Sequence, residues 1–417
     1  MIIDDNSKNN EKENDSLLNK DNRDNTNIIN DSNNSNDNNE TNNFSLIDKN
    51  QDIHFYFPKR MVQKIEKSSY IITLMESLSQ IYNFSHYFLK KDMSRNEKSI
   101  AEEFQNYIQN LWNEKEEGNT FVPKSFMKKI IKITDKKFSF KEELEPYIFY
   151  DYILDQLNKE LRGNDENIIK YYKHFYTKYK KLLEEKEEFK TFISKFITDN
   201  NSIISKTFYG IVEVNITCNR CRNKKKTIYE KFNKIDIDIL LFCNFKHRDG
   251  DSLINIYFDD LVNFYFNNND AIKGEDICSF CKKNTENNIE KQIIELPNYL
   301  VFRIKCDNSK DDQFYFIKSS YSFIDIDEII EIKKDYFSEN CSYNQNHLIK
   351  DSVKFKLFST IDYFEEKDRY ICKYRIKEKG KENNWYSFWC NSKGKEVSTY
   401  TDKFTSPCLL FYEIIKN

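Results

Sequence analysis

Apolar side chains recur at helical spacing through the first half of the chain, after a polar N-terminal stretch. Residues 1 to about 45 are mostly Asn, Asp and Ser with few apolar residues and no period, so we expect a disordered tail over residues 1–50. Residues 68–89 fit one helix, because their apolar positions repeat every three or four residues: Ile72, Met75, Leu78, Ile81 and Tyr82. Segments 100–112, 145–157 and 166–195 have the same kind of pattern. Residues 60–205 are therefore predicted to be mainly α.

The second half of the chain alternates between apolar and polar residues, as strands do. Residues 208–218 (FYGIVEVNITC) show this alternation clearly. Six further segments are β-like, namely 234–241, 298–306, 354–364, 368–376, 383–390 and 408–415. A helical first part followed by an antiparallel, β-rich second part predicts an α+β fold.

Composition excludes several classes of function. The chain has only 7 Gly among 417 residues and contains neither GxxxxGK[ST] nor GxGxxG, which argues against a phosphate-binding loop. Its formal net charge is −3, so nucleic acid is not indicated as a partner. The short run Lys224–Lys226 is interpreted as solvated surface.

The expected location is the nucleus or the cytoplasm. The N-terminus lacks the layout of a signal peptide, and no run of about 18 apolar residues predicts a membrane span. Ten Cys without a secretory signal indicate a reducing compartment, where metal binding or catalysis is favoured over disulfides.

Two Cys-x-x-Cys pairs predict a metal site. They are Cys218 with Cys221 and Cys278 with Cys281. A two-residue spacer lets both thiolates of a pair bind one tetrahedral Zn²⁺ from a tight turn, and two pairs complete a site of four Cys ligands. More than fifty residues separate the pairs, which fits turns at the tips of two long hairpins. We expect one structural Zn²⁺, because four thiolates leave no open position for catalysis.

The residues around these pairs resemble the ubiquitin-specific protease family. FYGIVEVNITCNRCRNKKKTIYEKFNKIDIDI (208–239) is similar to the family's first fingers segment, and SLINIYFDDLVNFYF (252–266) to the short helix that follows. CSFC (278–281) and KQIIELPNYLVFRIK (291–305) resemble the second turn and the next strand. The last strands, with WYSF (385–388) and LLFY (409–412), also resemble the family.

The resemblance implies a hand-like, papain-like cysteine protease fold over residues 51–417. The thumb would cover about 60–205, the fingers with their zinc turns about 206–305, and the palm strands about 295–417. Family members cleave after the C-terminal Gly-Gly of ubiquitin, using a Cys nucleophile, a His base, an orienting Asp or Asn, and an Asn that helps to hold the oxyanion.

Each catalytic position of the family carries a different residue in this chain. Its Asn-Thr-Cys aligns with Lys67, Ser68 and Ser69, so Ser69 stands at the nucleophile and Lys67 at the oxyanion Asn. Its Gly-Gly-His-Tyr aligns with residues 367–370, so Arg369 stands at the base, and the orienting residue aligns with Trp389. No Cys precedes Cys218 in the sequence. We therefore expect no functional catalytic residue among these positions.

The resemblance therefore implies a pseudo-deubiquitinase, a catalytically inactive scaffold subunit that binds ubiquitin, a ubiquitinated protein or other subunits of a complex. Two alternatives stay open. One is an active deubiquitinating hydrolase working through non-standard residues, such as Ser69 with Lys67. The other is a structural subunit of a spliceosomal or chromatin complex that binds no ubiquitin. The side chains of Lys367 and Asp368, at the family's Gly positions, are expected to fill the channel for ubiquitin's tail, with Asp368 paired to Arg369 or Lys67.

Overall fold

The computed structural model describes most of the chain from residue 60 onward. The described residues are 60–91, 93, 99–113, 115, 117–138, 140–163, 165–248, 256–267, 271–272, 277–283, 287–305, 324–341, 351–364, 367–378, 381–388, 395–397 and 406–415. The predicted tail and Trp389 lie outside these residues.

Helices dominate the first part of the described chain, as predicted. They are α1 (Ser69–Ser79), α2 (Tyr82–Lys90), α3 (Ile100–Leu111), α4 (Lys124–Ile133), α5 (Pro146–Leu161), α6 (Glu166–Lys178), α7 (Lys180–Glu185), α8 (Glu187–Asn200) and α9 (Ile203–Phe208). The short parallel strands β1 (Met61–Val62) and β2 (Thr120–Phe121) lie among them. Ser99 caps α3, where its Oγ accepts the Glu102 N–H at 3.1 Å, and Asp165 caps α6 in the same way.

Two predicted helices are divided in the structure. The segment 68–89 breaks at Gln80 and Ile81 into α1 and α2. At this break the hydroxyl of Ser79 donates to the Glu76 carbonyl at 2.6 Å, and that of Ser85 donates to the Ser79 carbonyl at 2.6 Å. Such bonds compete with the helical pattern, so the helix ends here. The segment 166–195 likewise forms three helices, α6 to α8.

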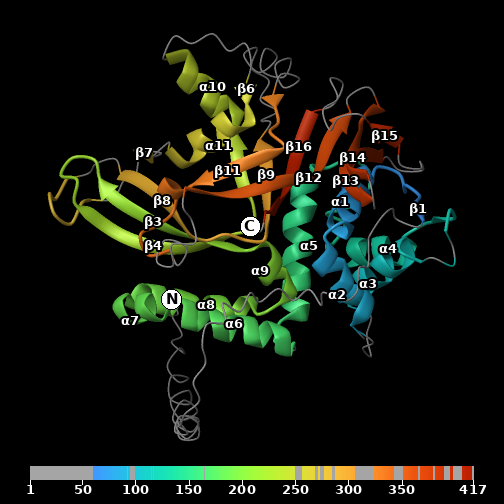
Figure 1. Ribbon diagram of the computed structural model, residues 1–417, viewed down its shortest axis with the longest axis horizontal. Coiled ribbons are helices and arrows are strands. Elements are labelled where there is room, and N and C mark those ends of the chain that lie inside the picture. Colours follow the sequence, from blue (N-terminus) through green and yellow to red (C-terminus); the bar gives the residue numbers. More distant parts are fainter. Residues whose placement is uncertain are drawn as a thin grey trace, which may run out of the picture. The chain divides into compact units, whose positions relative to one another are not determined.

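Eight of the described strands form one sheet in the second part of the chain. Its order is β15 (Lys395–Val397), β14 (Lys381–Phe388), β13 (Arg369–Glu378), β12 (Ser352–Phe364), β16 (Ser406–Ile414), β9 (Tyr299–Lys305) and β5 (Ile235–Asp238), with β11 (Ile329–Lys333) also paired to β12. The described neighbours run antiparallel except β5 and β9, which are parallel and depart from the prediction. The fold is α+β (Figure 1).

A second, four-stranded sheet carries the Cys pairs. Its order is β4 (Lys224–Phe232), β3 (Gly210–Cys218), β8 (Asn287–Glu295) and β7 (Ala271–Ile272). Helices α6 to α8 run along β3 and β4 (Figure 1), and the Phe189 ring of α8 meets the Tyr229 ring of β4 at 4.9 Å between centroids. Gly210 begins β3 where no side chain fits, since a Cβ there would lie 2.3 Å from the Phe232 ring.

The prediction of a strand over residues 234–241 is wrong for the second half of that segment. The strand β5 ends at Asp238, and α10 (Ile239–Arg248) begins there because Asp238 Oδ1 accepts the Leu241 N–H at 2.9 Å. The helix expected in 252–266 begins at Phe258 as α11 (Phe258–Asn267), after β6 (Ile256–Tyr257), which pairs with β10 (Ile324–Asp325).

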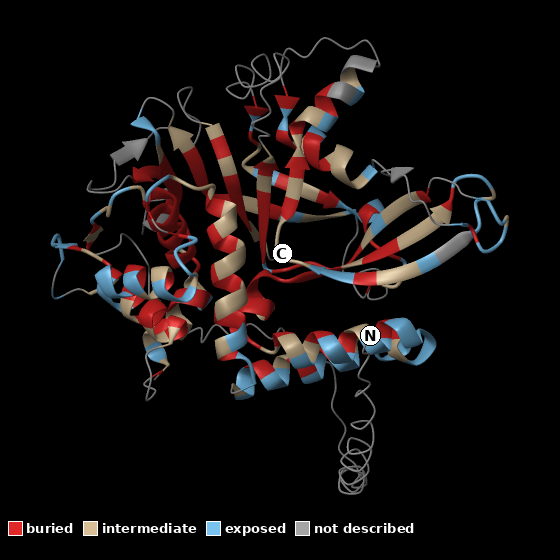
Figure 2. Ribbon diagram, turned by 180° about the vertical axis from the view of Figure 1, so that it is seen from behind, coloured by how far each residue is buried: buried red, intermediate tan, exposed pale blue. Residues whose placement is uncertain are grey.

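Buried residues concentrate in α1 and in the central strands of the large sheet, while α6 and α8 expose their outer faces (Figure 2). One apolar core joins the first helices to β12, β13 and β16, so the helical part and the sheet share an interior. None of the helices in the described ranges is long and apolar enough to cross a bilayer.

Candidate functional site

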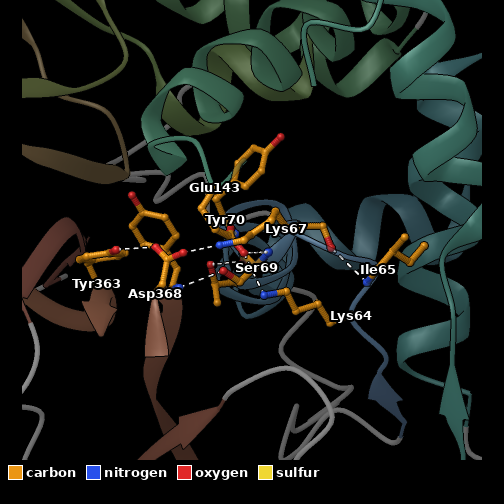
Figure 3. Close-up of polar contacts among 11 residues, drawn as sticks. Lys64, Ile65, Lys67, Ser69, Tyr70, Glu143, Tyr363 and Asp368 are labelled. Carbon is orange, nitrogen blue, oxygen red and sulfur yellow. Dashed lines mark hydrogen bonds and ion pairs between the residues drawn. The ribbon is translucent and has the colours of Figure 1, made fainter. Parts of the chain in front are cut away.

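The start of α1 and the start of β13 meet at one point, although about three hundred residues separate them. Ser69 is the first residue of α1 and is fully buried, and Arg369 is the first residue of β13. The hydroxyl oxygen of Ser69 accepts the backbone N–H of Tyr370 at 2.9 Å (Figure 3). Near the other end of α1, the Ser359 hydroxyl of β12 donates a hydrogen bond to the Ser77 hydroxyl at 3.0 Å. The structure thus brings the predicted nucleophile and base positions side by side.

A carboxylate occupies the N-terminus of α1. The two oxygens of Glu143 accept the backbone N–H groups of Ser69 and Tyr70, each at 3.3 Å. Lys64 Nζ lies 2.9 Å from the same carboxylate, and the Glu143 side chain is 4% exposed. An anion is favoured there, because the first N–H groups of a helix lack helical acceptors and its dipole is positive at this end.

Sequence reasoning missed Glu143. It lies outside the helices, between α4 and α5, where no apolar period marks it. The only local signal is a short acidic stretch that also holds Glu142 and Glu145. Its role depends on a contact across 74 residues, which no local pattern reveals.

A second polar contact crosses the same junction, and we call it the Lys67–Asp368 bridge. Lys67 Nζ donates to the Asp368 carboxylate, and the Tyr363 hydroxyl donates to its other oxygen at 2.7 Å (Figure 3). The hydrogen bond from Lys67 lowers the pKa of Asp368, and the same bond raises the pKa of Lys67. Of the two partners expected for Asp368, the structure therefore shows Lys67. The pair is exposed, at 42% and 60%, so it contributes little stability.

The turn before β13 has an unusual backbone. Asp368 has a φ of 46°, in the left-handed region that favours Gly. A Gly-containing turn would adopt this conformation without strain, and here an Asp adopts it while its side chain reaches Lys67. Lys367 is exposed in the same turn, and its Nζ lies 5.7 Å from the centroid of the Phe364 ring.

The four predicted metal ligands gather at the tips of the small sheet. Cys218 ends β3, Cys221 lies in the following turn, and Cys278 and Cys281 lie in the turn before β8. Sγ of Cys218 lies 3.8 Å from that of Cys281, and Sγ of Cys221 lies 3.7 Å from that of Cys278. All four sulfur atoms lie within 4.8 Å of one another.

These distances fit one tetrahedral metal ion. Thiolates at the usual Zn–S length of about 2.3 Å are about 3.8 Å apart along the edges of a tetrahedron. The sulfurs are too far apart for disulfides, whose S–S length is about 2.0 Å. The four cysteines can therefore bind a metal ion, with Cys218 and Cys278 buried and the other two partly buried.

The two turns share one backbone design. In the first, the Arg222 N–H donates to the Cys218 carbonyl at 2.8 Å, and in the second the Lys282 N–H donates to the Cys278 carbonyl at 2.8 Å. Arg222 and Lys282 both adopt left-handed φ values, of 54° and 56°. Because the two turns have the same geometry, each directs the sulfurs of its first and last cysteine toward the other turn.

The fold agrees with the match of this sequence to a family model. The model for ubiquitin carboxyl-terminal hydrolase matches residues 62–412, most of the chain. The chain belongs to the ubiquitin carboxyl-terminal hydrolase family. No curated protein matches it in sequence.

Solved structures share the family's fold with this chain at low identity. The SAGA DUB module Ubp8/Sgf11/Sus1/Sgf73 bound to monoubiquitin matches at 14% identity with a TM-score of 0.57, covering 89% of this chain and 73% of that one. The same module bound to ubiquitin aldehyde matches at 14% identity and a TM-score of 0.57, over 88% and 72%. A yeast SAGA DUB module with a mutant Sgf73 matches at 14% and 0.56, over 90% and 73%.

Proposed function

We propose that this chain is a pseudo-deubiquitinase, an inactive family member that acts as a scaffold binding ubiquitin or partner proteins. The observation that carries the proposal is the junction of α1 and β13. There Ser69 stands at the nucleophile position, and its hydroxyl oxygen accepts the Tyr370 N–H at 2.9 Å. Arg369, the neighbour of Tyr370, stands at the base position. A guanidinium does not accept a proton near neutral pH, and a serine without a base is a poor nucleophile.

The contacts of Lys67 argue against the first alternative, an active Ser69–Lys67 pair. A lysine serves as a general base when its pKa is lowered toward neutrality. Here the hydrogen bond to Asp368 raises the pKa of Lys67, and the ammonium is committed to that carboxylate. Lys67 therefore stays protonated and points to Asp368.

Glu143 adds a second obstacle to acyl transfer. Oxyanion intermediates are stabilised by N–H donors directed at the reacting oxygen. At the start of α1 the Ser69 and Tyr70 N–H groups already bond to the Glu143 carboxylate. An oxyanion forming at Ser69 would meet a buried negative charge in place of free donors.

The scaffold half of the proposal rests on the family and its relatives. The structural relatives are described as a module of Ubp8 with three other proteins, in forms bound to monoubiquitin and to ubiquitin aldehyde. By analogy, this chain is proposed to bind ubiquitin, a ubiquitinated protein or subunits of a complex. Within it, Cys218, Cys221, Cys278 and Cys281 would hold one structural Zn²⁺ that joins the two turns. We propose a nuclear or cytoplasmic location.

Two measurements on the full chain test the proposal. A fluorogenic ubiquitin substrate should show no turnover, and an electrophilic ubiquitin probe should not label Ser69, because removing triad members costs several orders of magnitude in rate. Enzyme-like turnover that is lost in Ser69→Ala would refute inactivity.

Calorimetric titration with ubiquitin then separates the two scaffold hypotheses. Binding supports the pseudo-deubiquitinase. No binding would favour the third hypothesis, a structural subunit of a spliceosomal or chromatin complex that makes no contact with ubiquitin. An unrelated protein of similar size serves as the control for non-specific binding.

A further inference from the structure

The far end of the small sheet, which we call the fingertip, consists of residues 219–223 and 277–283. The four Cys sulfurs lie within 4.8 Å of one another, so these two turns lie beside each other. The residues of the fingertip other than its three cysteines are exposed. Figure 2 shows this end of the sheet in pale blue, beyond the last buried residues of β3 and β8.

The second turn carries an unusual pair of apolar side chains. Ile277 is 69% exposed and Phe280 is 61% exposed, and these are the two largest values among the exposed large apolar residues of the described chain. Each packs little against its own fold, so neither is required for the core. Scattered single apolar residues on a surface are ordinary, whereas two at one projecting tip indicate a contact site.

The first turn is strongly cationic. Between Glu213 and Glu230 the sequence holds Arg220, Arg222 and the Lys224–Lys226 run, with no acidic residue. Arg220, Arg222 and Lys226 are exposed. Lys282 and Lys283 are exposed on the second turn, but Glu275, Asp276 and Glu286 lie next to this turn in the sequence, so the positive charge is concentrated on the first turn. A surface of this charge attracts an acidic partner.

We propose that the fingertip is a docking site for an acidic protein segment that carries apolar residues among its carboxylates. Ile277 and Phe280 would receive the apolar side chains, and Arg220 and Arg222 would pair with the carboxylates. The proposal rests on the scaffold role proposed above, and it names the chemistry of one partner.

The distribution of the residues favours a protein over a membrane. A bilayer would meet both turns of the tip together, but Asn219, Arg220 and Asn223 of the first turn are polar and exposed. Ile277 and Phe280 on the second turn thus lie beside Arg220 and Arg222 on the first, and Lys282 and Lys283 follow the apolar pair on its own turn, as a mixed acidic and apolar segment requires. Nucleic acid is disfavoured, because a single exposed aromatic ring, Phe280, offers little stacking surface.

The test uses the full, zinc-loaded chain and a fluorescein-labelled peptide in which Glu and Leu alternate. Fluorescence anisotropy should show saturable binding that weakens as salt is raised. A peptide with Gln in place of Glu should bind at least about tenfold more weakly, because charge pairing contributes to affinity. The variants Phe280→Ser and Arg220→Glu should each weaken binding of the Glu peptide about tenfold.

Two control variants match these changes elsewhere on the surface. Tyr257→Ser removes an aromatic ring that is 48% exposed, and Lys181→Glu reverses a charge whose side chain is 74% exposed. Both should leave the peptide affinity unchanged. The zinc content of each variant confirms that the turns are intact.

Several outcomes would overturn the fingertip site. They are equal affinity for the Glu and Gln peptides, equal losses in the control variants, no binding of the peptide, or binding only to phosphatidylserine vesicles or an oligonucleotide. Hydrolysis of ubiquitin substrates would refute the proposed function by a separate assay, so the two failures are distinguishable.

Discussion

Glu76 provides a quantitative test of how α1 packs on the large sheet. It lies on α1, is only 8% exposed, and accepts the Tyr374 hydroxyl at 3.4 Å. Burial raises the pKa of its carboxyl from 4.5 to about 7. The perturbation is Glu76→Gln, which keeps the shape and the acceptor oxygen and removes the titratable proton.

The magnitude follows from the two pKa values. Because the folded pKa exceeds the unfolded one, Glu76 contributes its full stability below pH 4.5 and loses it as the pH rises through about 7. A shift of this size corresponds to about 3 kcal/mol of unfolding free energy. The advantage of the Gln variant over the natural chain should therefore be about 3 kcal/mol larger at pH 8 than at pH 4.

Urea denaturation across this pH range measures the effect. The difference between the two proteins is compared at each pH, so titrations that both share cancel out. The control is Glu184→Gln, which makes the same chemical change at an exposed position of α7. A difference for Glu76→Gln that does not change with pH would show that its carboxyl is solvated, and the packing of α1 described above would be wrong.

Three further predictions concern the metal centre and the junction. Cys218→Ser should remove the roughly one equivalent of zinc expected by metal analysis and lower the melting temperature, and full stability without metal would contradict this. Glu143→Gln should destabilise the fold by about 1 kcal/mol, because the anion at the N-terminus of α1 and its contact with Lys64 are lost. Glu142→Gln is the matched control. Equal losses of stability for the two variants in urea denaturation would refute this role of Glu143. Deleting the last two Gly of ubiquitin should barely change its calorimetric affinity, since the channel that Lys367 and Asp368 are expected to fill would not receive the tail, and abolished binding would show the channel to be open.

The four-cysteine cluster was predictable from sequence because its chemistry is local. Each Cys-x-x-Cys pair needs only a two-residue turn, and the structure brings Cys218 and Cys221 to Cys278 and Cys281 as expected. Six of the eight strands of the large sheet were also predicted, since alternation reports a half-buried surface, whereas the short strands β11 and β15 were not. Family resemblance located Ser69 and Arg369, which the fold places at one junction.

The errors of sequence reasoning arose where one side chain decided the outcome. At Asp238 a carboxylate cap started a helix inside an apparent strand, and this signal was readable in principle. The helix predicted over 166–195 first breaks at Tyr179, directly after α6. The hydroxyl of Tyr179 donates at 2.9 Å to the carbonyl of Ile294, a residue that is distant in the sequence. Glu143 and the Lys67–Asp368 bridge likewise depend on distant partners, so periodicity could not reveal them.

The junction of α1 and β13 also has a consequence for synthesis on the ribosome. The bond between Ser69 and Tyr370 spans 301 residues, and the contact between Ser77 and Ser359 spans 282. At translation rates of about 5–20 residues per second, α1 emerges roughly 15–60 s before the strand that covers it. During that interval its side chains, which are buried along its whole length in the finished fold, lack their final partner. The nascent chain therefore needs a chaperone, or a provisional packing of its own helices, until the last strands arrive.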